Sequence, residues 1–111
     1  MKAISLLSLL ILFSCAHQGK QEDPITKAIN SRNRQFQQCH MESDSHKQAG
    51  KVRIRAILNG NGVVKDTYIV DSTFNDPNLH ACLEGILAQL KFPPGCADEF
   101  EIPFSFQSGQ I

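Results

Sequence analysis

The sequence has no excess of positive or negative charge. Eleven Lys and Arg residues balance eleven Asp and Glu residues in a chain of 111 residues, so the formal net charge is zero. Proteins that bind nucleic acid usually carry basic patches, and no basic run stands out here. We therefore expect no nucleic-acid partner. Internal repeats and low-complexity segments are also missing, and this length allows one domain.

The sequence also lacks an apolar run long enough to cross a bilayer, which takes about 20 residues. Its longest apolar stretch, residues 3–13, follows Met1 and Lys2 and has the length of the apolar part of a signal peptide. The stretch runs into Leu12-Phe13-Ser14-Cys15, which resembles the bacterial lipobox. The resemblance implies that residues 1–14 are a lipoprotein signal peptide and that Cys15 carries the lipid. The alternative is an ordinary secretory signal with an incidental cysteine.

Ala16, and no aspartate, follows the cysteine. In the sorting logic of lipoproteins, this implies a lipid-anchored protein of the outer membrane that faces the periplasm. Residues 15–23 are then the lipidated cysteine and a short polar tether. Eight extended residues reach about 25–30 Å, so we expect the domain to lie close to its membrane.

Residues 24–107 carry the patterns of the folded domain, and residues 108–111 form a tail. Asp23-Pro24 predicts the start of a helix, because Asp is a good N-cap and Pro fits the first helical turn. Apolar residues at helical spacing continue this helix to about Met41. Asp76-Pro77 predicts a second helix in the same way, ending near Lys91.

Two strands and a hairpin are predicted between these helices. Residues 51–58 alternate strictly, with Lys51, Arg53 and Arg55 on a wet, cationic face. The sequence Asn59-Gly60-Asn61-Gly62 predicts a turn, because Asn and Gly tolerate the positive φ of hairpins. The return strand, residues 63–71, alternates imperfectly. Either a bulge or burial on both sides at one end would explain this.

A third strand is predicted near the C-terminus, where Phe100, Ile102, Phe104 and Phe106 form an aromatic inner face. Pro103 cannot donate a ladder hydrogen bond, so one side of this strand must be open or bulged. The predicted order is α-β-β-α-β. It describes a two-layer α+β domain with a three-stranded antiparallel sheet and two helices.

Seven short motifs along residues 25–106 together resemble one family, the AgmX/PglI C-terminal domain, a relative of the TonB C-terminal domain. The motifs are Phe36-x-x-Cys39-His40, Gly50-Lys51-Val52, Asn61-Gly62, Asp71-Ser72-Thr73, Leu79-x-x-Cys82-Leu83, Phe92-Pro93 and Ile102-Pro103-Phe104-x-Phe106. The resemblance implies a TonB-like fold and a place in the cell envelope, and it carries over no catalytic residue. The family usually has tyrosine where this chain has His40.

Without Cys15, three cysteines remain, and they allow three pairings that the sequence alone does not separate. Cys39 and Cys82 both lie on the apolar faces of their predicted helices, and the family signature has both positions, which favours this pair. Cys96 is then either a surface thiol or a bridge to a second copy or another protein.

No cofactor, metal or catalytic activity is expected. Helical neighbours point about 100° apart and residues two apart point about 200° apart. Neither Cys39 with His40 nor His80 with Cys82 therefore forms a natural pair of zinc ligands. The chain also offers no nucleophile with a base and a third group to orient that base.

Two functions remain. In the first, the TonB-like domain is a protein-interaction module, accessory to an envelope transport or motility complex, whose exposed closing strand takes up a partner segment. The short tether excludes the energy transducer itself. In the second, the chain is a structural envelope lipoprotein that contacts peptidoglycan through its cationic strand or forms a disulfide-linked homodimer through Cys96. The strand residues of the first hypothesis are Phe100, Ile102, Phe104, Ser105 and Phe106.

Overall fold

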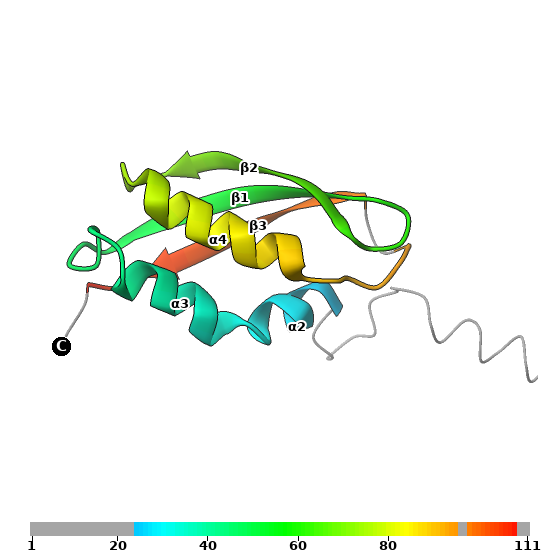
Figure 1. Cartoon of the computed structure of the whole chain (residues 1–111), viewed down its shortest axis with the longest axis horizontal. Helices are drawn as coiled ribbons and strands as arrows, with labels where there is room; N and C mark the ends of the chain where they lie inside the picture. The colour runs from blue at the N-terminus through cyan, green and yellow to red at the C-terminus, as the bar shows by residue number, and fades with distance from the viewer. Residues whose placement is uncertain (1–23, 96–97, 109–111) are drawn as a thin grey trace, which may run out of the picture.

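In the computed structural model, which describes residues 24–95 and 98–108, a three-stranded antiparallel sheet is covered on one side by helices (Figure 1). The predicted α+β class and the antiparallel sheet are confirmed. The sheet order is β2-β1-β3, so β1 is central and the other two strands form the edges. The elements in chain order are α2 (Pro24–Asn30), α3 (Asn33–Met41), β1 (Gly50–Leu58), β2 (Val64–Ser72), α4 (Pro77–Gln89) and β3 (Glu99–Phe106).

The prediction of one continuous helix from Pro24 to Met41 was wrong, because the chain breaks at Ser31 and Arg32 into α2 and α3. The hydroxyl of Ser31 donates to the carbonyl of Ala28 at 2.6 Å. Serine side chains compete in this way with the backbone bonds of a helix. The described chain therefore has three helices where two were expected.

Two β-bulges explain the imperfect alternation of β2. Its register with β1 skips Val70 opposite the step from Arg53 to Ile54, and it skips Lys65 opposite the step from Ile57 to Leu58. Each bulge adds one residue and shifts the inward-facing parity. Of the two explanations left open by the sequence, the bulge is the right one.

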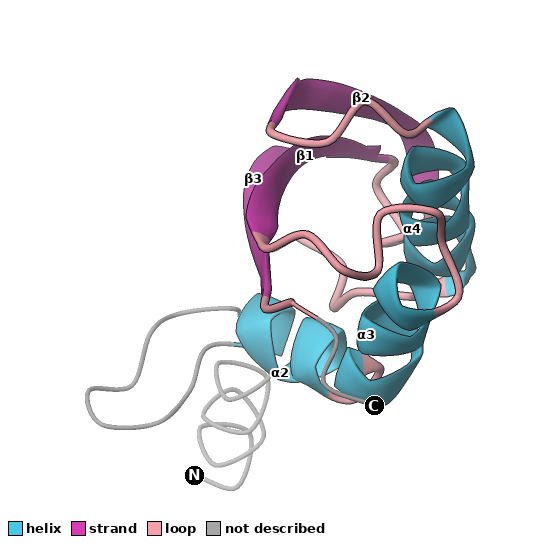
Figure 2. Cartoon of the chain, turned by 90° about the vertical axis from the view of Figure 1, so that its left-hand side faces the viewer, coloured by secondary structure: helices cyan, strands magenta, loops and turns pink. Residues whose placement is uncertain are grey.

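Most of the buried core residues come from β1, β3 and the helices, and Figure 2 shows from one end of the molecule how the helices face the sheet. The predicted inward residues of β1 are all buried, and the leucines of α4 meet them from the opposite layer. The main buried side chains are Phe36, Val52, Ile54, Leu79, Leu83, Leu87, Phe92, Ile102, Phe104 and Phe106.

The predicted start of α4 at Asp76-Pro77 is confirmed. The Asp76 side chain is almost fully buried and accepts hydrogen bonds from the backbone N–H of Leu79 at 3.0 Å and the hydroxyl of Ser45 at 2.8 Å. The bond from Leu79 lowers the pKa of Asp76, burial opposes this, and the bond from Ser45 lowers it further. One carboxylate thus caps α4 and fixes the loop that follows α3.

We predict that Asp76→Ala lowers the free energy of unfolding by about 2 kcal/mol, because the helix loses its cap and Ser45 loses its acceptor. Since the folded pKa of Asp76 is depressed, its ionic contribution is complete above about pH 4 and is lost as the pH falls through the folded value. Asp76→Asn keeps a capping oxygen but does not titrate. Urea unfolding between about pH 2 and pH 7 should therefore show a shallower acid loss in Asp76→Asn than in the wild type. Equal acid loss in both proteins would contradict this.

Candidate functional site

The backbone of β3 is open along one side. β3 pairs with β1 from Gly50↔Phe106 to Ile57↔Glu99, and no other strand of the described residues pairs with it. The N–H of Leu58 donates to the carbonyl of Asp98 at 2.7 Å, which sets the phase of the ladder. Backbone groups alternate in direction along an antiparallel strand. The odd-numbered residues of β3 therefore point their backbone groups away from β1, and the one open side required by Pro103 is confirmed.

The structure places all five predicted partner-binding residues on this edge strand, but most of their side chains face the core. Ile102, Phe104 and Phe106 are buried, and Phe100 is half-buried, whereas Ser105 is exposed. The predicted aromatic inner face is thereby confirmed. What β3 offers to a partner is its backbone and the outward side chains, not its phenylalanines.

Ring contacts hold the edge strand in place from within. Phe104 lies 4.7 Å from Phe36 of α3, measured between ring centroids. Phe106 stacks on the ring of His40 at 4.9 Å, and Phe74 packs against both of these rings. These contacts fix β3 against α3 and the segment that follows β2.

Two features reduce the number of outward backbone groups on β3 that can still form hydrogen bonds. Pro103 has no N–H to offer at its outward position. The outward carbonyl of Ser105 already lies 3.5 Å from the side-chain nitrogen of Gln37, which donates to it. In the described part of the chain, Glu99 and Glu101 are therefore the outward positions that keep both a donor and an acceptor.

The outer face of the sheet is less cationic than the sequence predicted. Arg53 donates to Asp71 of β2 and lies 3.6 Å from Glu101 of β3. Arg55 donates to the same Glu101 at 2.7 Å, and this bond raises the pKa of Arg55. The sequence did not reveal these pairs, because the acids come from the two neighbouring strands. The neutralised face gives little support to contact with an anionic polymer or lipid.

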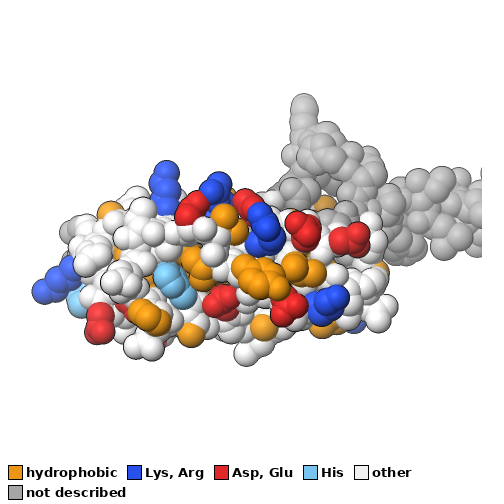
Figure 3. Space-filling model, turned by 90° about the horizontal axis from the view of Figure 1, so that it is seen from above, with side chains coloured by type: hydrophobic (Ala, Val, Ile, Leu, Met, Phe, Trp, Pro, Cys, Tyr) orange, Lys and Arg blue, Asp and Glu red, His pale blue; other side chains and the backbone are white. Residues whose placement is uncertain are grey.

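The second edge of the sheet was not recognised in the sequence. β2 pairs with β1 alone among the described strands, and its Tyr68 and Val70 are 51% and 37% exposed. Figure 3 views the molecule from the β2 side: hydrophobic side chains gather in the middle, with acidic and basic side chains around them. The bulged alternation of residues 63–71 was the signal in the sequence, because bulges are frequent in edge strands.

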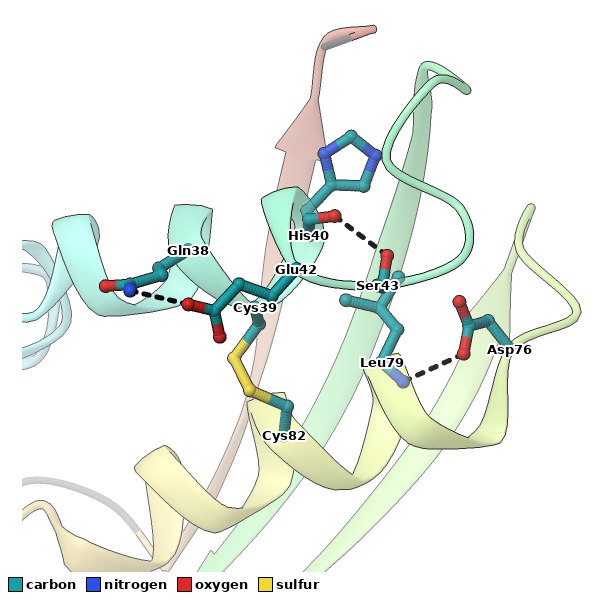
Figure 4. The surroundings of a disulfide bond; sticks show 8 residues. All are labelled: Gln38, Cys39, His40, Glu42, Ser43, Asp76, Leu79 and Cys82. Atoms are coloured by element: carbon teal, nitrogen blue, oxygen red, sulfur yellow. Dashed lines mark hydrogen bonds between the residues drawn. A yellow bond between two sulfur atoms is a disulfide. The ribbon is translucent and has the colours of Figure 1, made fainter. Parts of the chain in front are cut away.

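A disulfide joins Cys39 of α3 to Cys82 of α4, with an S–S distance of 2.04 Å and a Cα–Cα distance of 5.8 Å (Figure 4). The predicted pairing is confirmed. The expectation that both cysteines lie on apolar, inward faces was wrong for Cys82, which is exposed, whereas Cys39 is buried. Cys15 and Cys96, for which a lipid and an intermolecular bridge were considered, lie outside the described residues.

His40 and His80, which lie close in sequence to the two cysteines, form hydrogen bonds with other groups. Nε2 of His40 lies 2.8 Å from the carbonyl oxygen of Gln48, and Nε2 of His80 lies 2.8 Å from the hydroxyl of Ser72. No group of three or more His, Cys, Asp or Glu side chains that could hold a metal occurs within residues 24–95 and 98–108. In the same ranges, none of the helices has the length and apolarity that crossing a membrane requires.

Comparison with known proteins gives no relative: neither a family model, nor a curated protein, nor a solved structure matches this chain significantly.

Proposed function

We propose that this chain is a non-enzymatic cell-envelope lipoprotein whose TonB-like domain binds a protein partner by strand addition, as an accessory to an envelope transport or motility complex. The observation that supports this most is the open backbone edge of β3. An extended segment can gain main-chain hydrogen bonds at such an edge, and side-chain contacts on either side then give specificity.

The two parts of this edge would contribute differently. Glu99 and Glu101 would supply the main-chain hydrogen bonds, since each keeps an outward donor and acceptor. The Glu99 side chain is exposed, so a partner segment with a basic residue at the opposite position fits best. Past Pro103, only the N–H of Ser105 would be available as a further donor.

Ser105→Pro tests the role of the edge. Its N–H points away from β1, so proline there removes an edge donor and leaves the β1–β3 ladder intact. We expect at least a tenfold loss of partner capture from envelope extracts, about 1.4 kcal/mol of binding free energy, with an unchanged thermal midpoint. Ser105→Ala, which keeps the N–H, is the matched control and should capture the partner normally. Equal capture by both variants would exclude the Ser105 end of β3, and equal capture by Glu99→Pro and Glu99→Ala as well would exclude β3 as the binding edge.

The lipid anchor is a separate part of the proposal and is supported by the sequence of residues 1–16. We expect Cys15→Ala to move the protein from the outer-membrane fraction to the soluble periplasm, and to abolish labelling by a radioactive fatty acid. Cys96→Ser is the control, because it also removes one thiol but should leave both the fractionation and the labelling unchanged. If Cys15→Ala stays with the membrane, something other than the lipid holds it there.

A further inference from the structure

The open edge of β2 presents its own short run of hydrogen-bonding groups. On this side of β1, Lys51 accepts from the N–H of Thr73 at 2.9 Å, and Asn59 donates to Val63 at 2.9 Å. Odd-numbered β1 residues therefore bond to β2, and they include the pairs Arg55↔Tyr68 and Ile57↔Asp66. The residues in the alternate positions, Thr67 and Ile69, then direct their backbone N–H and C=O groups outward.

We propose that β2 pairs antiparallel with the β2 strand of a second copy of this chain, about a two-fold axis at Tyr68. In this register, Thr67 of one copy lies opposite Ile69 of the other, and the reverse pair follows by symmetry. These are the two positions with outward backbone groups, so they form the hydrogen-bonded pairs of the new ladder. The two sheets join into one sheet of six strands.

The side chains support the same register. Tyr68, half-exposed in one copy, meets Tyr68 of the second copy in a non-hydrogen-bonded pair, where side chains approach most closely and aromatic pairs are favourable. Counted past the bulges, Lys65 lies opposite Asp71 of the second copy on both sides of the axis, and there it shares this carboxylate with Arg53. Moving the axis to Thr67 or to Ile69 places Lys65 opposite Ile69 or Thr73, and the charge pairing is lost. One register therefore satisfies the backbone, the aromatic ring and the charges.

The other properties of the chain fit self-association at β2 better than at β3. The formal net charge is zero for the full chain and about one unit negative without residues 1–14, so two copies repel each other little over long range. At β3, the missing N–H of Pro103 and the contact from Gln37 interrupt the edge, whereas the run from Asp66 to Ile69 has no proline. Because the bulges at Lys65 and Val70 keep the regular contact short, we expect a weak dimer at the small end of interface sizes.

A cysteine introduced on the axis tests the register. In non-hydrogen-bonded pairs the Cα atoms lie about 4.5 Å apart, which is within the range for disulfides. In full-length chain carrying Cys96→Ser, we expect Tyr68→Cys to form a disulfide-linked dimer on mild oxidation, seen on a non-reducing gel. Val70→Cys is the matched control on the same strand. Its two copies lie four residues apart along the strands, about 13 Å, so it should not cross-link above the Cys96→Ser parent. No dimer with Tyr68→Cys, or equal dimer with both, overturns the proposal.

Charge reversal gives an independent test with the native Tyr68. We expect Lys65→Asp to weaken dimerisation about tenfold in sedimentation equilibrium, because two symmetry-related contacts become repulsive. Lys65→Ala should weaken the association less than Lys65→Asp, because it removes the attraction to Asp71 without adding a repulsion and leaves the bond between Asp71 and Arg53 intact. Far-UV circular dichroism checks that each variant is folded. An unaffected Lys65→Asp variant, or an equal effect of Lys65→Ala and Lys65→Asp, contradicts the register.

Discussion

Replacing Cys39 and Cys82 together should lower the free energy of unfolding by about 4 kcal/mol. The bridge spans 43 residues of sequence, and a loop of this size is worth about that much in the chain-entropy model, less where the unfolded chain keeps structure. The enclosed segment contains both strands of the hairpin and the first turns of α4. A domain of this size has a total stability of only about 5–10 kcal/mol, so this one bond decides whether the domain survives mild heating.

The variant is best made as Cys39→Ala with Cys82→Ser, because Cys39 is buried and Cys82 is exposed. Urea unfolding should show the loss, and a phosphine reductant should bring the wild type down to nearly the same stability. The double variant itself should not respond to the reductant. Cys96→Ser serves as the control and should match the wild type with and without reductant. A double variant within about 1 kcal/mol of the wild type would show that the helices are held mainly by packing.

The periodic parts of the fold were predictable because burial leaves a direct mark on sequence. Strict alternation in residues 51–58 indicated a central strand with one inward face, and Val52, Ile54, Ala56 and Leu58 are buried there. The aspartate–proline pair at 76–77 marked the start of α4 by its capping chemistry. The alternation and the helix cap both depend on residues that are close in sequence, so they can be recognised from one sequence.

The features that were missed depend on residues far apart in sequence. Arg53 and Arg55 were read as a cationic row, but Asp71 and Glu101 from the flanking strands neutralise them. The apolar pattern of residues 24–41 by itself favours one helix, so it did not reveal the break at Ser31. The exposure of Cys82 follows from how α4 is rotated on the sheet, and α4 has so few charged residues that its sequence gave little sign of this orientation.

The same limit applies to the edges of the sheet. Pro103 identified β3 as an edge, because proline has a definite backbone meaning. No single residue identified β2 as an edge strand, because its bulges appeared in the sequence only as imperfect alternation. The pairing order β2-β1-β3 made both edges visible and showed that they differ. Our proposals accordingly assign a short partner segment to the edge interrupted by Pro103 and a second copy to the edge around Tyr68.

The hairpin turn gives the second large effect. Its four residues, Asn59 to Gly62, all tolerate positive φ, and the sequence did not distinguish between them. In the structure Gly62 alone of the four has a positive φ, at 83°. Its carbonyl also accepts the N–H of Phe92 at 2.8 Å, which ties the hairpin to the segment after α4. A Cβ at position 62 would overlap the carbonyl oxygen of Phe92, whereas a Cβ at position 60 would have no heavy atom within 4 Å.

Gly62→Ala should therefore lower the free energy of unfolding by about 3 kcal/mol or more. About 1–2 kcal/mol comes from the left-handed backbone, and about 1–3 kcal/mol comes from displacing the backbone at Phe92. Gly60→Ala, made in the same turn, should stay within about 0.5 kcal/mol of the wild type or be slightly more stable. Urea unfolding of the two variants in parallel measures the difference. A similar loss in both would mean that the turn as a whole, and not the approach of Gly62 to Phe92, sets the geometry from which β2 begins.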